Sequence, residues 1–210
     1  MADDAAKGDN MRLDLFGRLA GTALMAMGLS ACIDVSIDVD VTSPTTARAT
    51  MTQVMGADFY AMVKMSEESG EMDEGSFCGD EGTLTENADG SGTCTMVEEG
   101  PFDSLDLGQE AGGITFAAAG PGLVRVALPT DEMMEGMDAE EDMDEESRQM
   151  MEAFFAGRTI TIGISGAQVV ETNMTLSGDG RRAEQVIPLL DLVNGTADLP
   201  DELFAVVRAP

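Results

Sequence analysis

Three groups of residues in this chain could do chemistry: a run of oxygen ligands, a methionine-rich segment and three cysteines. The oxygen ligands lie in NADGSGTCTMVE, where Asn87, Asp89 and Ser91 alternate, Gly92 follows and Glu98 comes six residues later. This is the ligand spacing of an EF-hand calcium loop. The flanks GTLTE and TCTMVEEG are typical of strands rather than helices, so a hairpin turn explains the same residues. The sequence leaves calcium binding and a plain turn as alternatives.

The methionine-rich segment is a second candidate metal site. Six methionines fall within 133–151, and ten of the sixteen residues at 131–146 are acidic. Thioethers are soft ligands, so an exported segment of this kind can bind Cu(I). The alternative is that Met150 and Met151 pack with Phe154 on the apolar face of a helix, while the acidic part is a solvated insert.

Cys32 has the most specific surroundings of the three cysteines. The tripeptide Leu-Ser-Ala precedes it, residues 19–29 are uncharged, and two arginines stand before that run. A basic start, a short apolar stretch and small residues at the cleavage point describe a secretory signal, and the cysteine completes a lipobox. A membrane-crossing helix needs about 20 apolar residues, which this stretch does not reach. We therefore predict that 1–31 is a lipoprotein signal peptide, with Met11 as an alternative start, and that Cys32 is lipidated.

Lipidation would decide where the protein resides. Two or three acyl chains on Cys32 bury many methylene groups at about 0.8 kcal/mol each, which makes anchoring stable. The next residue is Ile33 rather than Asp, and the sorting rule of Gram-negative lipoproteins then predicts the outer membrane, with the domain facing the periplasm. Export also predicts a disulfide between Cys78 and Cys94. A redox role for this pair lacks a Cys-x-x-Cys spacing and a nearby base.

Charge and composition exclude several classes of function. The 210 residues carry a formal net charge of -29, so nucleic acid would be repelled. The chain contains no histidine, which removes imidazole catalysis and His metal ligands. Acidic pairs are so frequent that spacing singles out none as a general acid and base, and we assign no catalytic residue and no cofactor. The basic doublet at 181–182 fits either an anionic headgroup or the protein's own acids.

The elements that must position these residues are mostly predicted strands. Ten residues from Ile33 to Thr42 alternate apolar and polar side chains, which is typical of a half-buried strand, and Thr46 to Gln53 is the predicted return strand. Further strands are predicted at 83–86, 92–98, 114–118, 123–128, 159–165, 167–175 and 203–208. Helices are predicted at 56–68 and 147–156, with a helical turn at 102–107, and 183–192 fits a strand or a helix.

These segments predict one α+β domain over 32–210. Its antiparallel sheet would be built from hairpins, with two or three packed helices and the acidic, methionine-rich insert at 131–146.

The order of these segments resembles the LppM-type domain of bacterial lipoproteins. The matching parts are the lipobox cysteine, CIDVSIDVDV, ARATMTQVM, a helix, NADGSGTCTMVEEGPFDSL, RTITIGISGAQVVETNM and AEQVIPLLDL, which span most of 32–208. The resemblance implies an anchored α+β domain that holds a lipid or glycolipid between sheet and helices. We therefore predict a membrane-anchored, non-enzymatic envelope lipoprotein that binds an apolar ligand or a protein partner. A periplasmic lipoprotein that binds calcium or copper is the alternative.

Overall fold

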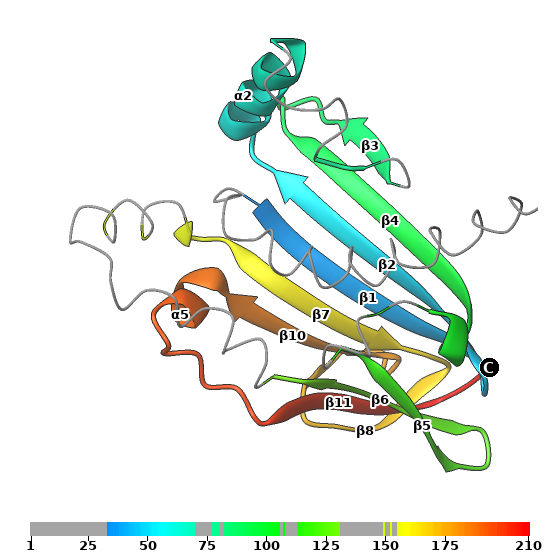
Figure 1. Ribbon diagram of the computed structural model, residues 1–210. Helices are drawn as coiled ribbons and strands as arrows, with labels where there is room; N and C mark the ends of the chain where they lie inside the picture. Colours follow the sequence, from blue (N-terminus) through cyan, green and yellow to red (C-terminus); the bar gives the residue numbers. More distant parts are fainter. Residues whose placement is uncertain are drawn as a thin grey trace, which may run out of the picture.

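Two β-sheets that share one hydrophobic core make up most of the structure (Figure 1). The computed structural model describes residues 33–69, 77–79, 82–105, 107, 113–130, 149, 152 and 155–210. Cys32, the predicted signal peptide and the insert at 131–146 lie outside these residues, as does most of the helix predicted at 147–156.

The larger sheet has seven strands in the order β3-β4-β2-β1-β7-β10-β9. Their bounds are Ile33–Ser43 (β1), Thr46–Met55 (β2), Thr83–Glu86 (β3), Gly92–Pro101 (β4), Thr159–Ser165 (β7), Thr175–Leu176 (β9) and Arg182–Pro188 (β10). The smaller sheet has the order β5-β6-β11-β8. Its strands are Thr115–Gly120 (β5), Leu123–Pro129 (β6), Gln168–Thr172 (β8) and Glu202–Arg208 (β11).

The alternation in β1 places its apolar residues in the core, as predicted. Val35, Val39 and Val41 are buried, while Asp34 and Asp38 lie on the opposite face, because successive side chains of a strand point to opposite sides. Each of these two acids meets an arginine there. Arg158, next to β7, and Arg182 of β10 thus offset two of the charges on the polar face of the strand.

The prediction that the sheet is antiparallel is wrong at the centre of the seven-stranded sheet. Strand β1 pairs in parallel with β7, in a register that places Val35 beside Ile160 and Val39 beside Ile164. Parallel partners cannot be joined by a tight turn, so hairpin signals in the sequence do not reveal them. The sheet is mixed.

Most of the segment predicted as one strand at 167–175 lies outside the seven-stranded sheet. After a turn at Gly166 it enters the other sheet as β8, which pairs with β11, and the chain then returns as β9 and β10. This crossing brings Val169 into the core beside residues of both sheets. The two sheets are therefore linked at this point by adjacent segments of the chain.

The predicted α+β class is also wrong, because the described residues are mostly strand and contain two short α-helices, Ala57–Glu68 (α2) and Leu189–Val193 (α5). The helical turn at 102–107 is a 3-10 helix, Phe102–Ser104 (η2). Segment 183–192 divides at Pro188 into β10 and α5. Helices this short do not form a packed layer, and the second layer over the core is the smaller sheet. Neither described helix has the length and apolar character needed to cross a membrane.

The core lies between the two sheets, in a region that we call the sandwich: β1, β7, β10 and α5 with the four-stranded sheet. Helix α2 and strand β3 lie toward the edge of the seven-stranded sheet that is farther from the sandwich (Figure 1). Helix α2 also projects beyond the end of the sheet at which β1 begins. We call the region formed by 57–69, 77–79 and 82–94 the corner.

Candidate functional site

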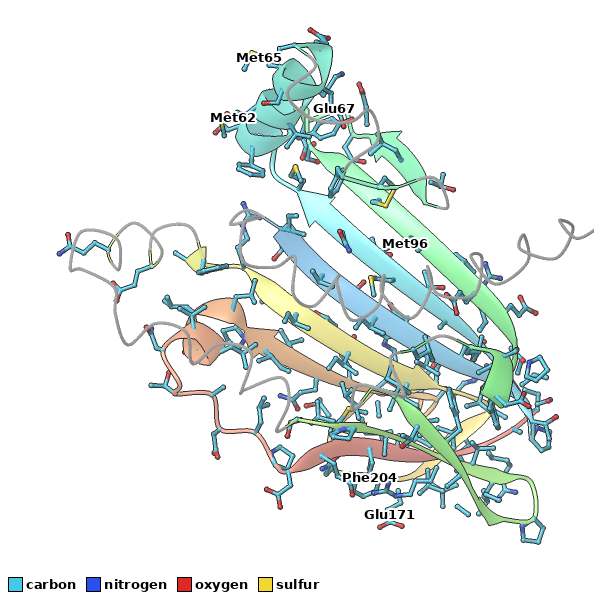
Figure 2. The ribbon with its side chains drawn as sticks, in the orientation of Figure 1. Met62, Met65, Glu67, Met96, Glu171 and Phe204 are labelled. Atoms are coloured by element: carbon cyan, nitrogen blue, oxygen red, sulfur yellow. A yellow bond between two sulfur atoms is a disulfide. The ribbon has the colours of Figure 1, made fainter. Side chains whose placement is uncertain are left out.

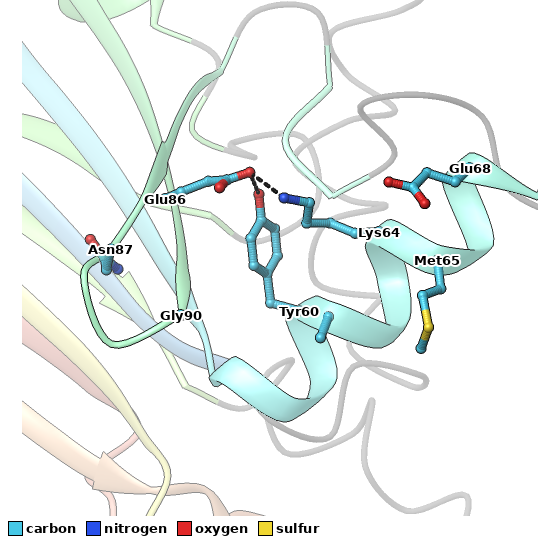
Figure 3. A pocket seen from close by; sticks show the side chains of 8 residues that line it. Tyr60, Lys64, Met65, Glu68, Glu86, Asn87 and Gly90 are labelled. Carbon is cyan, nitrogen blue, oxygen red and sulfur yellow. Dashed lines mark hydrogen bonds and ion pairs between the residues drawn. The ribbon is translucent and has the colours of Figure 1, made fainter.

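The corner contains a groove between α2 and the turn that joins β3 to β4 (Figure 3). Its volume is about 350 Å³, and it is open to solvent on one side. The groove is lined by Tyr60, Ala61, Lys64, Met65, Glu68, Glu86, Asn87 and Gly90. It therefore combines a ring and a thioether with a small set of polar groups, the mixture found in many ligand sites.

Two side chains donate to one carboxylate oxygen of Glu86 inside the groove. The Tyr60 hydroxyl donates to Glu86 Oε1 at 3.2 Å, and Lys64 Nζ donates to the same oxygen at 2.6 Å. The Lys64 ammonium also lies 5.6 Å from the centroid of the Tyr60 ring. Helix α2 presents the tyrosine and the lysine one turn apart, and the last residue of β3 supplies the carboxylate.

These contacts shift the pKa of each group in the direction that its partners dictate. The hydrogen bond from Lys64 and its positive charge lower the pKa of Glu86. In turn, the hydrogen bond to Glu86 and the negative charge of Glu86 raise the pKa of Lys64. Burial, followed by the negative charge of Glu86, raises the pKa of Tyr60. All three shifts stabilise the protonation states present at neutral pH. Such groups suit the binding of a polar ligand end better than proton transfer near pH 7.

Close packing holds α2 against the hairpin. The ring of Tyr60 lies over Gly92, where a Cβ atom would come within 2.6 Å of the ring carbon Cδ2. Tyr60 also contacts Phe77 edge to face, with ring centroids 6.1 Å apart. Glycine at position 92 is therefore required by the approach of the aromatic ring, not by the backbone angles.

The predicted disulfide between Cys78 and Cys94 is present in the corner, and both residues are buried. The cross-link joins the segment at 77–79 to the inner face of β4, over a sequence separation of 16. Gly82 passes directly over it, and a Cβ atom there would overlap the sulfur of Cys78. The bond thus fixes the chain that leads into β3.

The calcium-type spacing at 87–98 forms a hairpin turn. Asp89 Oδ1 accepts hydrogen bonds from the Ser91 hydroxyl at 2.7 Å and the Ser91 amide at 3.0 Å, which lower the pKa of Asp89. Asn87 donates to Ser91 and Thr93. Glu98 lies six residues beyond Gly92 along β4, about 20 Å away in an extended strand. The twelfth ligand therefore does not reach the turn, and among the described residues no cluster of three or more acids or cysteines could hold a metal ion.

Of the basic doublet at 181–182, Arg182 forms ion pairs with acidic residues of the seven-stranded sheet. Its guanidinium contacts Asp38 on one side and Glu184 on the other, the latter at 3.0 Å. It reaches across Gly163 of β7, where a Cβ atom would overlap it. Arg182 therefore satisfies the protein's own acids, the commoner of the two uses considered from the sequence.

Of the other predicted site residues, Cys32 and the methionines at 133–151 lie outside the described residues. The groove itself was not predicted. Its one sequence signal is the helix pattern that places Tyr60 and Lys64 on the same side of α2, but the partner Glu86 is 22 residues away from Lys64.

Comparisons with known proteins give one structural neighbour. No protein-family model matches the chain, and no curated protein matches it in sequence. Among solved structures, the NMR structure of the folded domain of Mycobacterium tuberculosis LppM matches with a TM-score of 0.45 and 11% sequence identity. The match covers 84% of this chain and 90% of that one. Similarity at this level does not establish a common fold, and the function is argued below from the residues of this chain.

Proposed function

We propose that this protein is a lipid-anchored, non-enzymatic protein of the cell envelope, attached through Cys32 and facing the periplasm from the outer membrane. The observation that carries the proposal is the sequence before Cys32: two arginines, an uncharged run over 19–29 and the tripeptide Leu-Ser-Ala, which together describe a lipoprotein signal. Ile33, the residue after the lipobox cysteine, is a buried residue of β1. Cleavage before Cys32 would keep every residue of that strand.

The corner supplies the second line of support. A disulfide is expected in an exported protein and is rare in the cytosol, where thiols are kept reduced. Cys94 is fully buried, so its cross-link is part of the core of the corner rather than an exposed redox pair. The presence of the disulfide and its burial both agree with the location outside the cytosol that the signal sequence predicts.

The ligand part of the proposal places an apolar molecule with a polar end, or a protein partner, at the groove. The Tyr60 ring and Met65 offer apolar contact, and the pair of Lys64 and Glu86 offers one donor and one acceptor close together. Because the groove is open and about 350 Å³ in volume, it suits part of a molecule rather than its complete enclosure.

The experiment is intact mass analysis of the full chain expressed in a Gram-negative host with radiolabelled palmitate. We expect the mature protein to begin at Cys32 and carry label, and Cys32→Ser to abolish both cleavage and labelling. Cys78→Ser is the matched control, because it also removes a cysteine and should retain the label. An unlabelled protein that still carries 1–31 would refute the proposal. Native mass spectrometry of the same preparation tests for a retained apolar molecule.

A further inference from the structure

We infer that the exposed face of α2 contacts the lipid surface beside the anchor, through Met62 and Met65. This inference rests on the proposed function, because it requires acyl chains on Cys32. It adds an orientation: the corner faces the bilayer and the four-stranded sheet faces away from it.

The exposure of these two methionines is the first argument. Met62 is 50% exposed and Met65 is 63% exposed, although the helix buries Tyr60 and Val63 on its other side. The two methionines stand three positions apart, so they lie next to each other on one face of the helix. Figure 2 shows both on the side of α2 that points away from β3 and β4, although Met65 also lines the groove. Methionine side chains are flexible and apolar, which suits a deformable lipid surface.

The position of the anchor is the second argument. Ile33, the residue after Cys32, pairs with Met55 in the sheet, and α2 begins two residues later at Ala57. Adding a strand pair, two extended residues and the first helical turns places Met62 within about 25 Å of the anchor. Because β1 begins directly after Cys32, no tether is available to lift this end of the domain far from the bilayer.

The charges around the two methionines define the kind of lipid surface. Asp58 lies one turn before Met62, and Glu68 lies one turn after Met65; both are exposed. Lys64 on the same helix is paired with Glu86 and so does not offset them. The contact is therefore shallow, limited to the two thioether side chains, and it favours zwitterionic over anionic headgroups.

The test places a fluorophore at the predicted contact in the full lipidated protein. Met65→Cys is labelled with the environment-sensitive dye NBD; the acylated Cys32 and the disulfide do not react. The protein is then incorporated into phosphatidylcholine vesicles. We expect the emission to shift to the blue and to be quenched at least twofold by spin labels attached near the lipid headgroups. Replacing a third of the lipid by phosphatidylglycerol should reduce both effects.

Val170→Cys is the matched control, because Val170 is 51% exposed and lies on β8 of the other sheet. Strand β8 and helix α2 lie at opposite sides of the molecule (Figure 1). Equal emission from the two positions in vesicles that retain the protein would overturn the inference and leave the anchor standing. A shift at Met65 that appears without vesicles and grows with protein concentration would assign the face to protein contact and also overturn it. Protein that does not float with the vesicles would refute the anchor, and the inference would fall with it.

Discussion

The sandwich and the corner are stabilised by different means, although β4, β2 and β1 connect them in one sheet. Of the largest side chains that are fully buried in the described residues, ten belong to the sandwich: Ile162, Ile164, Ile187, Leu192, Leu203, Val39, Val41, Val124, Val126 and Val207. The remaining one is Cys94, in the corner. All four residues of β3 are exposed.

This difference shows what a sheet needs where no second sheet covers it. In the sandwich, burial of branched aliphatic side chains between two sheets provides the stabilising free energy. In the corner, where Tyr60 and Val63 are buried, a disulfide, an edge-to-face pair of aromatic rings and an ion pair supply much of the stabilisation. A region held in this way can leave apolar groups and polar groups exposed together, and that is where the groove lies.

The largest expected effect is a cavity in the sandwich. Ile162→Ala removes a fully buried side chain of β7, and we expect the free energy of unfolding to fall by about 4 kcal/mol. Chemical denaturation of the full chain measures this change. Val186→Ala on the neighbouring strand removes a half-exposed side chain and should cost roughly 0.5 kcal/mol or less. Equal losses for the two variants would contradict the assignment of the sandwich as the stabilising core.

Removal of the disulfide should weaken the corner selectively. We expect the variant with Cys78→Ala and Cys94→Ala to lower the free energy of opening this region by about 3 kcal/mol, because the reduced chain regains the entropy of an open loop. Hydrogen exchange read by mass spectrometry should then be faster in α2 and β3, while β7 and β11 keep their protection. Faster exchange spread evenly over both sheets would mean that the two regions are not energetically distinct.

The smallest effect concerns the exposed ion pair of the groove. The pKa of Glu86 is lowered from its ordinary value of 4.5 by Lys64, so its contribution is present above pH 4.5 and is lost as the pH falls through the lowered value. We expect an NMR titration to place the Glu86 carboxyl below 4.5, and Lys64→Met to return it toward that value. Glu171→Gln, which removes a negative charge from the other sheet, should leave the titration of Glu86 unchanged.

Local patterns allowed many elements to be predicted, but not their partners. The alternation from Ile33 to Thr42 identified β1 and its buried face, and the turn residues at 87–92 identified the hairpin. The partner of β1 could not be predicted, because the parallel pairing with β7 depends on tertiary packing rather than on a turn. The fold class was wrong for a related reason: the sequence does not show that, in the described residues, a second sheet rather than a layer of helices covers the core.

In the candidate site, too, local features could be predicted from the sequence, whereas contacts between separate elements could not. The cysteine pair could be predicted from residue type and compartment, since a disulfide needs two thiols and an oxidising environment. The groove could not, because it depends on a contact between Lys64 and Glu86, which belong to different elements. The calcium-type spacing was misleading at Glu98, since ligand spacing has meaning only when the chain curls around the ion, and β4 is extended there.

The parallel pairing of β1 with β7 also bears on the order in which the chain assembles. Ser165 donates a hydrogen bond to Asp40, 125 residues earlier, so the central strand must wait for most of the polypeptide to emerge. Strands β1, β2 and β4 can associate in the meantime, since successive antiparallel contacts join them. Until the late strand arrives, one edge of β1 offers unpaired backbone groups to any neighbouring chain. Assembly of this protein in a crowded compartment is therefore expected to benefit from a holding chaperone during that interval.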